Sequence, residues 1–340
     1  MGKPTIAAKA KAAGRRIRRG AFDAIFHGAA GLAANLPQVR DRLRQCRITE
    51  NVPYVRRGGE VLALDVLQPL AAGPHPVILY LHGGGFAVCS RETHRPIAAI
   101  YAARGYLVFN IDYRLAPRHR FPAALEDACD AWSWIAENIE RYGGDRDRVV
   151  VAGESAGANL ALSLLLCACT ERPEPWAARV REGSFRAAAG LLYCGFLQTS
   201  HPERYRRDGV SALAARIARD AAVDYLGTDA TSPRPEQALA DPLCLVEAMT
   251  SGVPLPPLFI AAGGDDPVAP DSWRLADALV RLGMPHRVAR YPGETHAFHV
   301  MPWREAAKRC WGDSFRFLDQ TLATHVRTGE PRPEENALRP

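Results

Sequence analysis

A serine stands at the centre of the clearest chemical signal in this chain. Residues 153–157 read GESAG; they follow an apolar run at 148–153 and precede a helical pattern at 156–170. A G-x-S-x-G motif between a strand and a helix places the serine on a sharp, strained turn with its oxygen exposed for attack. The alternative is a glycine-rich turn with an ordinary N-capping serine, because short motifs recur by chance. We expect Ser155 to be a nucleophile.

A serine nucleophile needs a base, and the base needs an orienting acid. The apolar run at 256–264 ends in Asp265 and Asp266, and a later loop, beyond a further helix and strand, carries His296. The order serine, aspartate, histidine, each beyond a strand, is typical of a serine hydrolase triad built at one edge of a sheet. At this point Asp265 and Asp266 are alternative acids, and His299 is an alternative to His296.

Three consecutive glycines follow another apolar run, in the sequence YLHGGGF at 80–86. Glycine weakens a strand, so the run indicates a backbone that a ligand approaches closely. Attack on an ester carbonyl creates negative charge that preorganised N–H donors stabilise by roughly 2.7–4 kcal/mol each. We expect the N–H groups of Gly84, Gly85 and Ala156 to form this oxyanion hole. The residues expected to support the loop are His82, through hydrogen bonds rather than as a base, and Gly83.

These residues require a sheet that brings several strand ends to one edge. Short apolar runs, several without alternation, predict strands that are covered on both faces. Helical patterns lie between most of them, which indicates an α/β fold with a mostly parallel central sheet flanked by helices. Two alternating stretches within 47–68, joined around Gly58-Gly59, predict an antiparallel hairpin. The predicted strands are 76–82, 106–112, 148–153, 188–194, 256–264 and 286–293, and the predicted helices are 94–104, 122–141, 156–170, 270–283 and 303–324.

Two segments break this alternation. Residues 1–45 precede the sheet, and residues 195–250 interrupt it between two predicted strands. An insertion at the carboxyl edge of a parallel sheet lies over the place where such sheets bind ligands. We therefore expect 1–45 and 195–250 to form a helical cap over a core made of 46–194 and 251–325. Residues 326–340 are expected to be a flexible tail.

Composition argues against several other classes of protein. The net charge is +6, but residues 1–20 carry seven Lys and Arg and no acid, so the remainder is near neutral and predicts no nucleic-acid surface. No stretch has the roughly 18 uncharged apolar residues of a membrane helix, and Asp23 and His27 interrupt the candidate export signal. The eight cysteines lack metal or CxxC spacing, which is typical of free thiols in a reducing compartment. We predict a cytoplasmic protein without stable membrane insertion.

Taken together and in this order, HGGGF, GESAG, DDP and the final His296 resemble the hormone-sensitive-lipase-like family of α/β-hydrolase esterases. The segment DYRLAPRHRFPAALED at 112–127 is similar to the family's segment between the glycine loop and the nucleophile. The resemblance covers roughly residues 75–325 of the chain. The family's Asp-Pro-hydrophobic pattern favours Asp266 over Asp265 as the acid.

What the resemblance implies is a specific set of site residues, with neither a metal nor an organic cofactor. The implied groups are a Ser155–His296–Asp266 triad, an oxyanion hole from Gly84, Gly85 and Ala156, and a helical cap. The chain departs from the family where Glu154, which we place among the supporting residues, replaces a frequent Asp. Arg118 and Cys89 are further departures, and they leave local contacts and the shape of the pocket open.

The leading hypothesis is a serine carboxylesterase that hydrolyses small-molecule esters with short to medium acyl chains through an acyl-enzyme. An acetyl-hydrolase or amidase that acts on an acylated secondary metabolite would use the same triad. A non-catalytic small-molecule receptor on the same fold is the alternative from another class. Such a receptor is expected to lack a triad member, whereas every candidate is present here. The sequence leaves a homodimer open.

Overall fold

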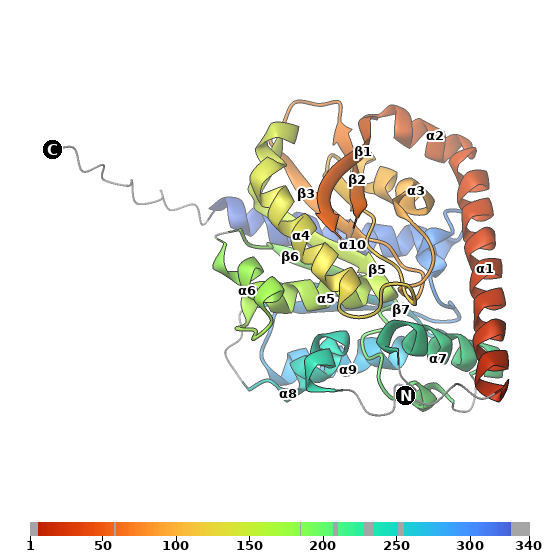
Figure 1. The fold of residues 1–340 in the computed structure, drawn as a ribbon. Helices are drawn as coiled ribbons and strands as arrows, with labels where there is room; N and C mark the ends of the chain where they lie inside the picture. Colours follow the sequence, from red (N-terminus) through yellow and green to blue (C-terminus); the bar gives the residue numbers. More distant parts are fainter. Residues whose placement is uncertain are drawn as a thin grey trace.

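One eight-stranded sheet forms the centre of the protein (Figure 1). The computed structural model describes residues 6–57, 59–183, 185–206, 210–227, 234–250 and 255–327. The strand order is β1-β2-β4-β3-β5-β6-β7-β8; β1–β2 and β2–β4 are antiparallel, and the pairs from β4–β3 to β7–β8 are parallel. The strands are β1 Cys46–Arg57, β2 Glu60–Pro69, β3 His75–Leu81, β4 Leu107–Ile111, β5 Gly144–Glu154, β6 Ala189–Tyr193, β7 Leu258–Gly263 and β8 His286–Tyr291. The predicted α/β fold is confirmed.

The helices cover both faces of this sheet, as the alternation of patterns predicts. The sequence analysis does not foresee α6 and α8, which are short and begin with proline. Gly58, at the turn of the predicted hairpin, lies outside the described residues, and its two strands pair as expected. The helices are α1 Ile6–Ala34, α2 Pro37–Arg44, α3 Arg91–Ala103, α4 Ala123–Asn138, α5 Ala156–Cys169, α6 Pro175–Glu182, α7 Ala212–Leu226, α8 Pro242–Ala248, α9 Ala269–Arg281 and α10 Glu305–Arg327.

Strand β3 shows why the core divides in two. Its side chains alternate between the faces of the sheet, so Val77, Leu79 and Leu81 join one hydrophobic cluster with residues of α4, α5 and α9. Ile78 and Tyr80 join the other, with residues of α3 and α10. All five are fully buried. A strand covered on both faces is apolar throughout, which is why the run shows no alternation.

The two segments expected to form a cap contribute helices that meet at one side of the molecule. Helix α1 runs along that side, and α7 packs against its first half (Figure 1). Hydrogen bonds from Arg18 to Asp220 and from Arg19 to Asp224 join the two helices. The division into core and cap stays a prediction. Of the predicted flexible tail, residues 328–340 lie outside the described residues.

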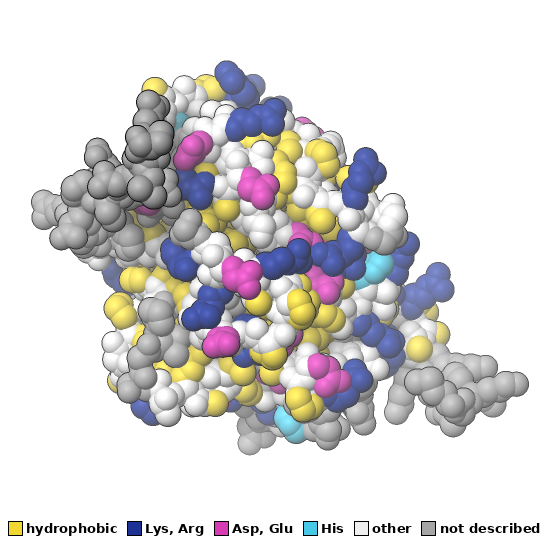
Figure 2. Space-filling model, turned by 60° about the vertical axis from the view of Figure 1, so that its left-hand side comes forward, with side chains coloured by type: hydrophobic (Ala, Val, Ile, Leu, Met, Phe, Trp, Pro, Cys, Tyr) yellow, Lys and Arg dark blue, Asp and Glu magenta, His cyan; other side chains and the backbone are white. Residues whose placement is uncertain are grey.

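Basic and acidic side chains lie interspersed on the face that Figure 2 shows. Within the described part of the chain, no helix combines the length and the apolar character needed to cross a bilayer. All eight cysteines are free thiols, and six of them are buried.

Candidate active site

The turn between β5 and α5 holds Ser155 in a strained conformation. Its φ of 52° and ψ of −115° lie outside the regions that L-residues favour, and such positions cost on the order of 1–3 kcal/mol. A Cβ at Gly153 would lie 2.3 Å from the Gly157 carbonyl oxygen, and one at Gly157 would lie 2.0 Å from that of Leu81. The strand and the helix therefore approach closely enough that only glycine fits at both positions.

Three side chains from three strand ends meet at this turn. The Ser155 Oγ lies 2.9 Å from Nε2 of His296, and Nδ1 of His296 lies 2.9 Å from both carboxylate oxygens of Asp266. Asp266 is 1% exposed and also accepts a hydrogen bond from the Val268 N–H. Asp265 is exposed to solvent. The structure thus brings Asp266, rather than its neighbour, against the imidazole.

The partners of His296 fix its tautomer. Because a carboxylate only accepts, Nδ1 must donate its proton to Asp266, and Nε2 keeps a lone pair that faces the Ser155 hydroxyl. Burial of the imidazole lowers the pKa of His296, but the charge of Asp266 and its hydrogen bond outweigh this effect. The pKa of His296 consequently lies above its ordinary value. An imidazole in this state can accept a proton from the serine.

The glycine loop follows β3 and faces the same turn. Gly84 has a φ of 106°, and a Cβ there would lie 2.2 Å from the Val88 carbonyl oxygen, so the loop's own fold requires this glycine. Gly85 has a φ of 60°, and its Cβ would lie 3.1 Å from Ala221 of α7. Among the described residues, no acceptor is bound to the N–H groups of Gly84, Gly85 or Ala156. These donors are available to a ligand.

Aromatic side chains brace this loop from both sides. His82 stacks on Tyr113 with ring centroids 4.2 Å apart, and the Tyr113 hydroxyl donates to the His82 carbonyl oxygen. Burial lowers the pKa of His82 to about 3, so its ring is neutral; its Nδ1 lies 2.7 Å from the Gly83 carbonyl oxygen. Phe86 stacks on Tyr225 of α7 at 3.7 Å. The segment at 112–127 and helix α7 therefore both hold the loop in place.

Beneath the loop, Glu154 is buried between two histidines. Its carboxylate lies 2.5 Å from Nε2 of His94 and 2.8 Å from Nε2 of His299. Burial alone would raise the pKa of Glu154, but the two histidines hold it well below its usual range. His299 is therefore a partner of Glu154 and not of Ser155. The sequence analysis does not single out His94, because a lone histidine in a helix carries no motif.

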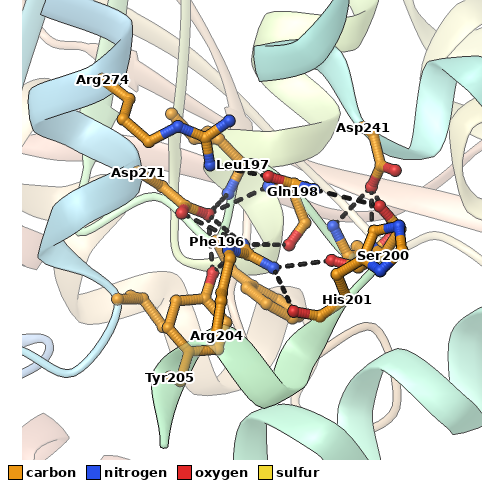
Figure 3. A network of polar contacts seen from close by, with 12 residues as sticks. Phe196, Leu197, Gln198, Ser200, His201, Arg204, Tyr205, Asp241, Asp271 and Arg274 are labelled. Carbon is orange, nitrogen blue, oxygen red and sulfur yellow. Dashed lines mark hydrogen bonds and ion pairs between the residues drawn. The ribbon is translucent and has the colours of Figure 1, made fainter. Parts of the chain in front are cut away.

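A second buried carboxylate anchors the root of the 195–250 insertion (Figure 3). Asp271, in the first turn of α9, accepts hydrogen bonds from the backbone N–H groups of Leu197 and Gln198. It also accepts from the side chains of Arg204 and Tyr205. Since α9 directly follows the Asp266 loop, this network ties the insertion to the segment that carries the acid of the site.

Asp241 fixes the next residues of the same insertion. Its carboxylate accepts from the backbone N–H groups of Thr199 and Ser200 at 2.6 and 2.9 Å, and from the Thr199 hydroxyl at 2.9 Å. Both aspartates are almost fully buried. The backbone that leaves β6 therefore has its donors satisfied away from solvent, as buried donors require. No sequence motif indicates this role for either residue.

A cavity of about 310 Å³ opens above the serine. Its floor contains Ser155, His296 and the three glycines of the loop, and its walls come from α1 and α7. Apolar side chains form much of the lining; those from the two helices are Phe22, Phe26, Ala214, Ile217, Ala218 and Ala221. Such a cavity can hold a small, largely apolar ligand with a carbonyl group at its floor.

One group of side chains at this site could ligate a metal. Cys194, Asp266 and His296 offer three ligand atoms within 4.8 Å of one another. Two of these residues are already hydrogen-bonded to each other, and burial raises the pKa of the Cys194 thiol well above its usual value. A metal would have to displace both a proton and that hydrogen bond. In the structure, His296 contacts Asp266 through Nδ1 and Ser155 through Nε2.

Comparison with known proteins adds independent information. A family model described as alpha/beta hydrolase fold matches residues 78–300. The carboxylesterase NlhH of Mycobacterium tuberculosis is 29% identical, over 76% of this chain and 81% of its own. The versiconal hemiacetal acetate esterase of Dothistroma septosporum is 26% identical, over 86% and 87%. The crystal structure of esterase LipW from Mycobacterium marinum superimposes with a TM-score of 0.72 at 24% identity, covering 91% of this chain and 90% of LipW.

Proposed function

Because this chain belongs to the hormone-sensitive-lipase-like family of α/β-hydrolases, we propose that its site hydrolyses carboxylic esters by a serine mechanism with an acyl-enzyme intermediate. The protein is an ester hydrolase, as are the relatives named above. The observation that carries the serine mechanism is the continuous contact from Ser155 through His296 to Asp266. Its substrates are small-molecule esters that fit beneath α1 and α7.

The first half-reaction transfers the acyl group to the protein. Nε2 of His296 takes the proton of Ser155 while Oγ attacks the carbonyl carbon, and the Asp266 carboxylate stabilises the imidazolium that forms. The carbonyl oxygen becomes an oxyanion that the free N–H groups of Gly84, Gly85 and Ala156 receive. The imidazolium then protonates the leaving alcohol, and the ester bond breaks.

The second half-reaction hydrolyses the acyl-enzyme and regenerates the free Ser155 hydroxyl. Water replaces the alcohol, His296 takes one of its protons, and the hydroxide attacks the acyl carbon of the Ser155 ester. The same donors stabilise the second oxyanion, and collapse releases the carboxylic acid as the serine recovers its proton. Both half-reactions use the three side chains, the three backbone N–H groups and water.

Covalent labelling tests this assignment directly. A fluorophosphonate probe should add to Ser155 of the native protein and to no other serine, because among the described residues only this serine hydroxyl lies within hydrogen-bond distance of an imidazole. Intact-mass and peptide analysis locates the adduct, and Ser155→Ala should lose labelling and at least about 10⁴-fold in ester hydrolysis while keeping its melting temperature. Labelling at another serine, or full labelling of Ser155→Ala, contradicts the mechanism.

A second candidate function keeps the mechanism and changes the substrate. The likeness to versiconal hemiacetal acetate esterase over 86% of the chain favours an acetyl-hydrolase that acts on an acylated secondary metabolite. An acetate series with alcohols of increasing size, run beside the matching acetamides, separates the two. Preference for acetate on bulky alcohols supports this candidate, whereas preference for longer acyl groups on small alcohols supports the general carboxylesterase.

A further inference from the structure

Three arginines of helix α1, Arg15, Arg18 and Arg19, line the cavity. Their partners are two carboxylates of α7. Arg18 donates from Nε to Asp220 at 2.9 Å and makes a second, shorter contact to the same oxygen. Arg19 donates to Asp224 at 2.8 Å. Arg15 reaches only the other oxygen of Asp224, at 3.3 Å, without a hydrogen bond. One carboxylate is thus shared by two guanidinium groups.

Of the three arginines, Arg15 has the most distant carboxylate partner. A guanidinium carries five N–H donors and always bears a positive charge. Within the described residues, none of these donors makes a hydrogen bond, and the Nε of Arg15 is buried from solvent. Asp23 does not neutralise it, since its carboxylate accepts from the Cys89 N–H and pairs with His27. Arg15 nevertheless lines the cavity that contains Ser155.

Arg15 shares Asp224 with Arg19, and its side chain, which is 25% exposed, lines an apolar cavity without a hydrogen bond to any described residue, so it can take an anionic partner from that cavity. We propose that Arg15 binds a carboxylate carried by the substrate, at the end remote from the scissile ester. This inference rests on the proposed function and adds a substrate class to it: esters that bear a free carboxylate. The fork of the guanidinium matches a carboxylate with two parallel hydrogen bonds, which neither Asp220 nor Asp224 supplies to Arg15.

A matched pair of substrates isolates this contact. 4-Nitrophenyl hexanoate and the mono-4-nitrophenyl ester of adipic acid share the leaving group and the chain length, and differ by a terminal carboxylate. The measured quantity is the ratio of kcat/KM for the adipate ester to that for the hexanoate ester. In Arg15→Gln this ratio should fall about tenfold or more, mostly through KM, because a charge-assisted hydrogen bond is lost.

Arg16→Gln is the matched control, because Arg16 is the neighbouring residue of α1 and is exposed to solvent. It removes the same charge from the same helix turn, so it should leave the ratio unchanged. An equal fall in both variants means that the field of α1, and not the Arg15 fork, attracts the anion, and this result overturns the proposal. Arg15→Lys, which keeps the charge without the fork, should recover part of the ratio.

Two further readouts separate this role from a merely structural one. A partly exposed ion pair contributes little to stability, so the melting temperature of Arg15→Gln should be little changed, whereas a structural latch predicts a clearly lower one. The acetate of 4-hydroxybenzoic acid, beside phenyl acetate, places the carboxylate on the alcohol side. The substrate pair in which the charged-to-neutral ratio of kcat/KM falls shows whether the carboxylate lies on the acyl side or the alcohol side of the ester. Equal kcat/KM losses for charged and neutral esters in both pairs refute the proposal, while continued hydrolysis of hexanoate keeps the ester hydrolase intact.

Discussion

The sheet and helix α1 are held in place in opposite ways. Every residue of β6 and β7 is buried, whereas none of the described side chains of α1, residues 12–34, is buried. Packing fixes the end of β7, which Asp266 follows closely in the chain. Ion pairs to α7 and a hydrogen bond from the Cys89 N–H to Asp23 hold α1.

This difference separates the chemistry of the site from its selectivity. Close-packed interiors are rigid, and small displacements there are costly, so changes at the strand ends should alter the rate strongly. A partly exposed ion pair contributes about 0–1 kcal/mol, so changes in the cap should alter which ester is accepted. The following predictions rank these effects.

The largest effect is expected at the buried acid. Asp266→Asn should reduce kcat by about 10³–10⁴-fold, because the amide no longer holds the tautomer that leaves Nε2 free. Asp265→Asn, a matched neighbour exposed to solvent, should change kcat less than about threefold. Steady-state kinetics of the two variants measures this difference. Comparable losses of kcat would contradict the assignment of the buried Asp266, rather than Asp265, as the partner of His296.

The same carboxylate sets the pH dependence. A base must be neutral to accept the serine proton, so activity is present above the pKa of His296 and is lost as the pH falls through it. Because Asp266 raises that pKa, the acidic limb of kcat/KM in the native enzyme should lie above the ordinary value of about 6.5. In Asp266→Asn the limb should move to lower pH. A limb that stays in place would contradict the assigned pair.

An intermediate effect is expected in the glycine loop. Gly84→Ala should lower kcat by about 10²-fold, because its Cβ would meet the Val88 carbonyl oxygen and displace an oxyanion donor. Gly59→Ala is the matched control: its φ is also positive, at 83°, but nothing lies within 4 Å of the added atom. It should lose stability through strain and keep its kcat. Equal kcat in the two variants would remove Gly84 from the oxyanion hole.

The smallest effect is expected in the cap. Asp220→Asn weakens the pairing with Arg18, so α1 should separate from α7 more easily and admit longer acyl chains. We expect about a twofold rise in kcat/KM for octanoyl and longer esters relative to butyryl esters, and a similar rise in the native enzyme at high salt. A profile across acyl chain lengths measures it. A fall for long chains would show that the ion pair shapes the pocket rather than closing it.

How far the sequence predicts the molecule depends on where each partner lies in the chain. The strands, the serine turn and the glycine loop are local patterns, and all are found where expected. Glu154 contacts His94, from which it is separated by 60 positions in the chain, and Arg18 contacts Asp220, 202 positions away. No spacing rule connects such pairs, because the fold alone brings them together. Likewise, no motif connects Asp271 with the backbone N–H groups of Leu197 and Gln198, from which it accepts hydrogen bonds.

His296 lies in the loop after β8, the last strand of the described residues, and this position has a consequence for the newly made chain. Ser155 and His296 are 141 residues apart, and the imidazole reaches the serine only once β8 has paired with β7. Contacts between distant segments form late in folding. A ribosome-bound chain that has completed β5 and α5 therefore carries its strained serine turn without a base. During translation, the Ser155 hydroxyl therefore lacks its imidazole partner until β8 and the loop of His296 have emerged and folded.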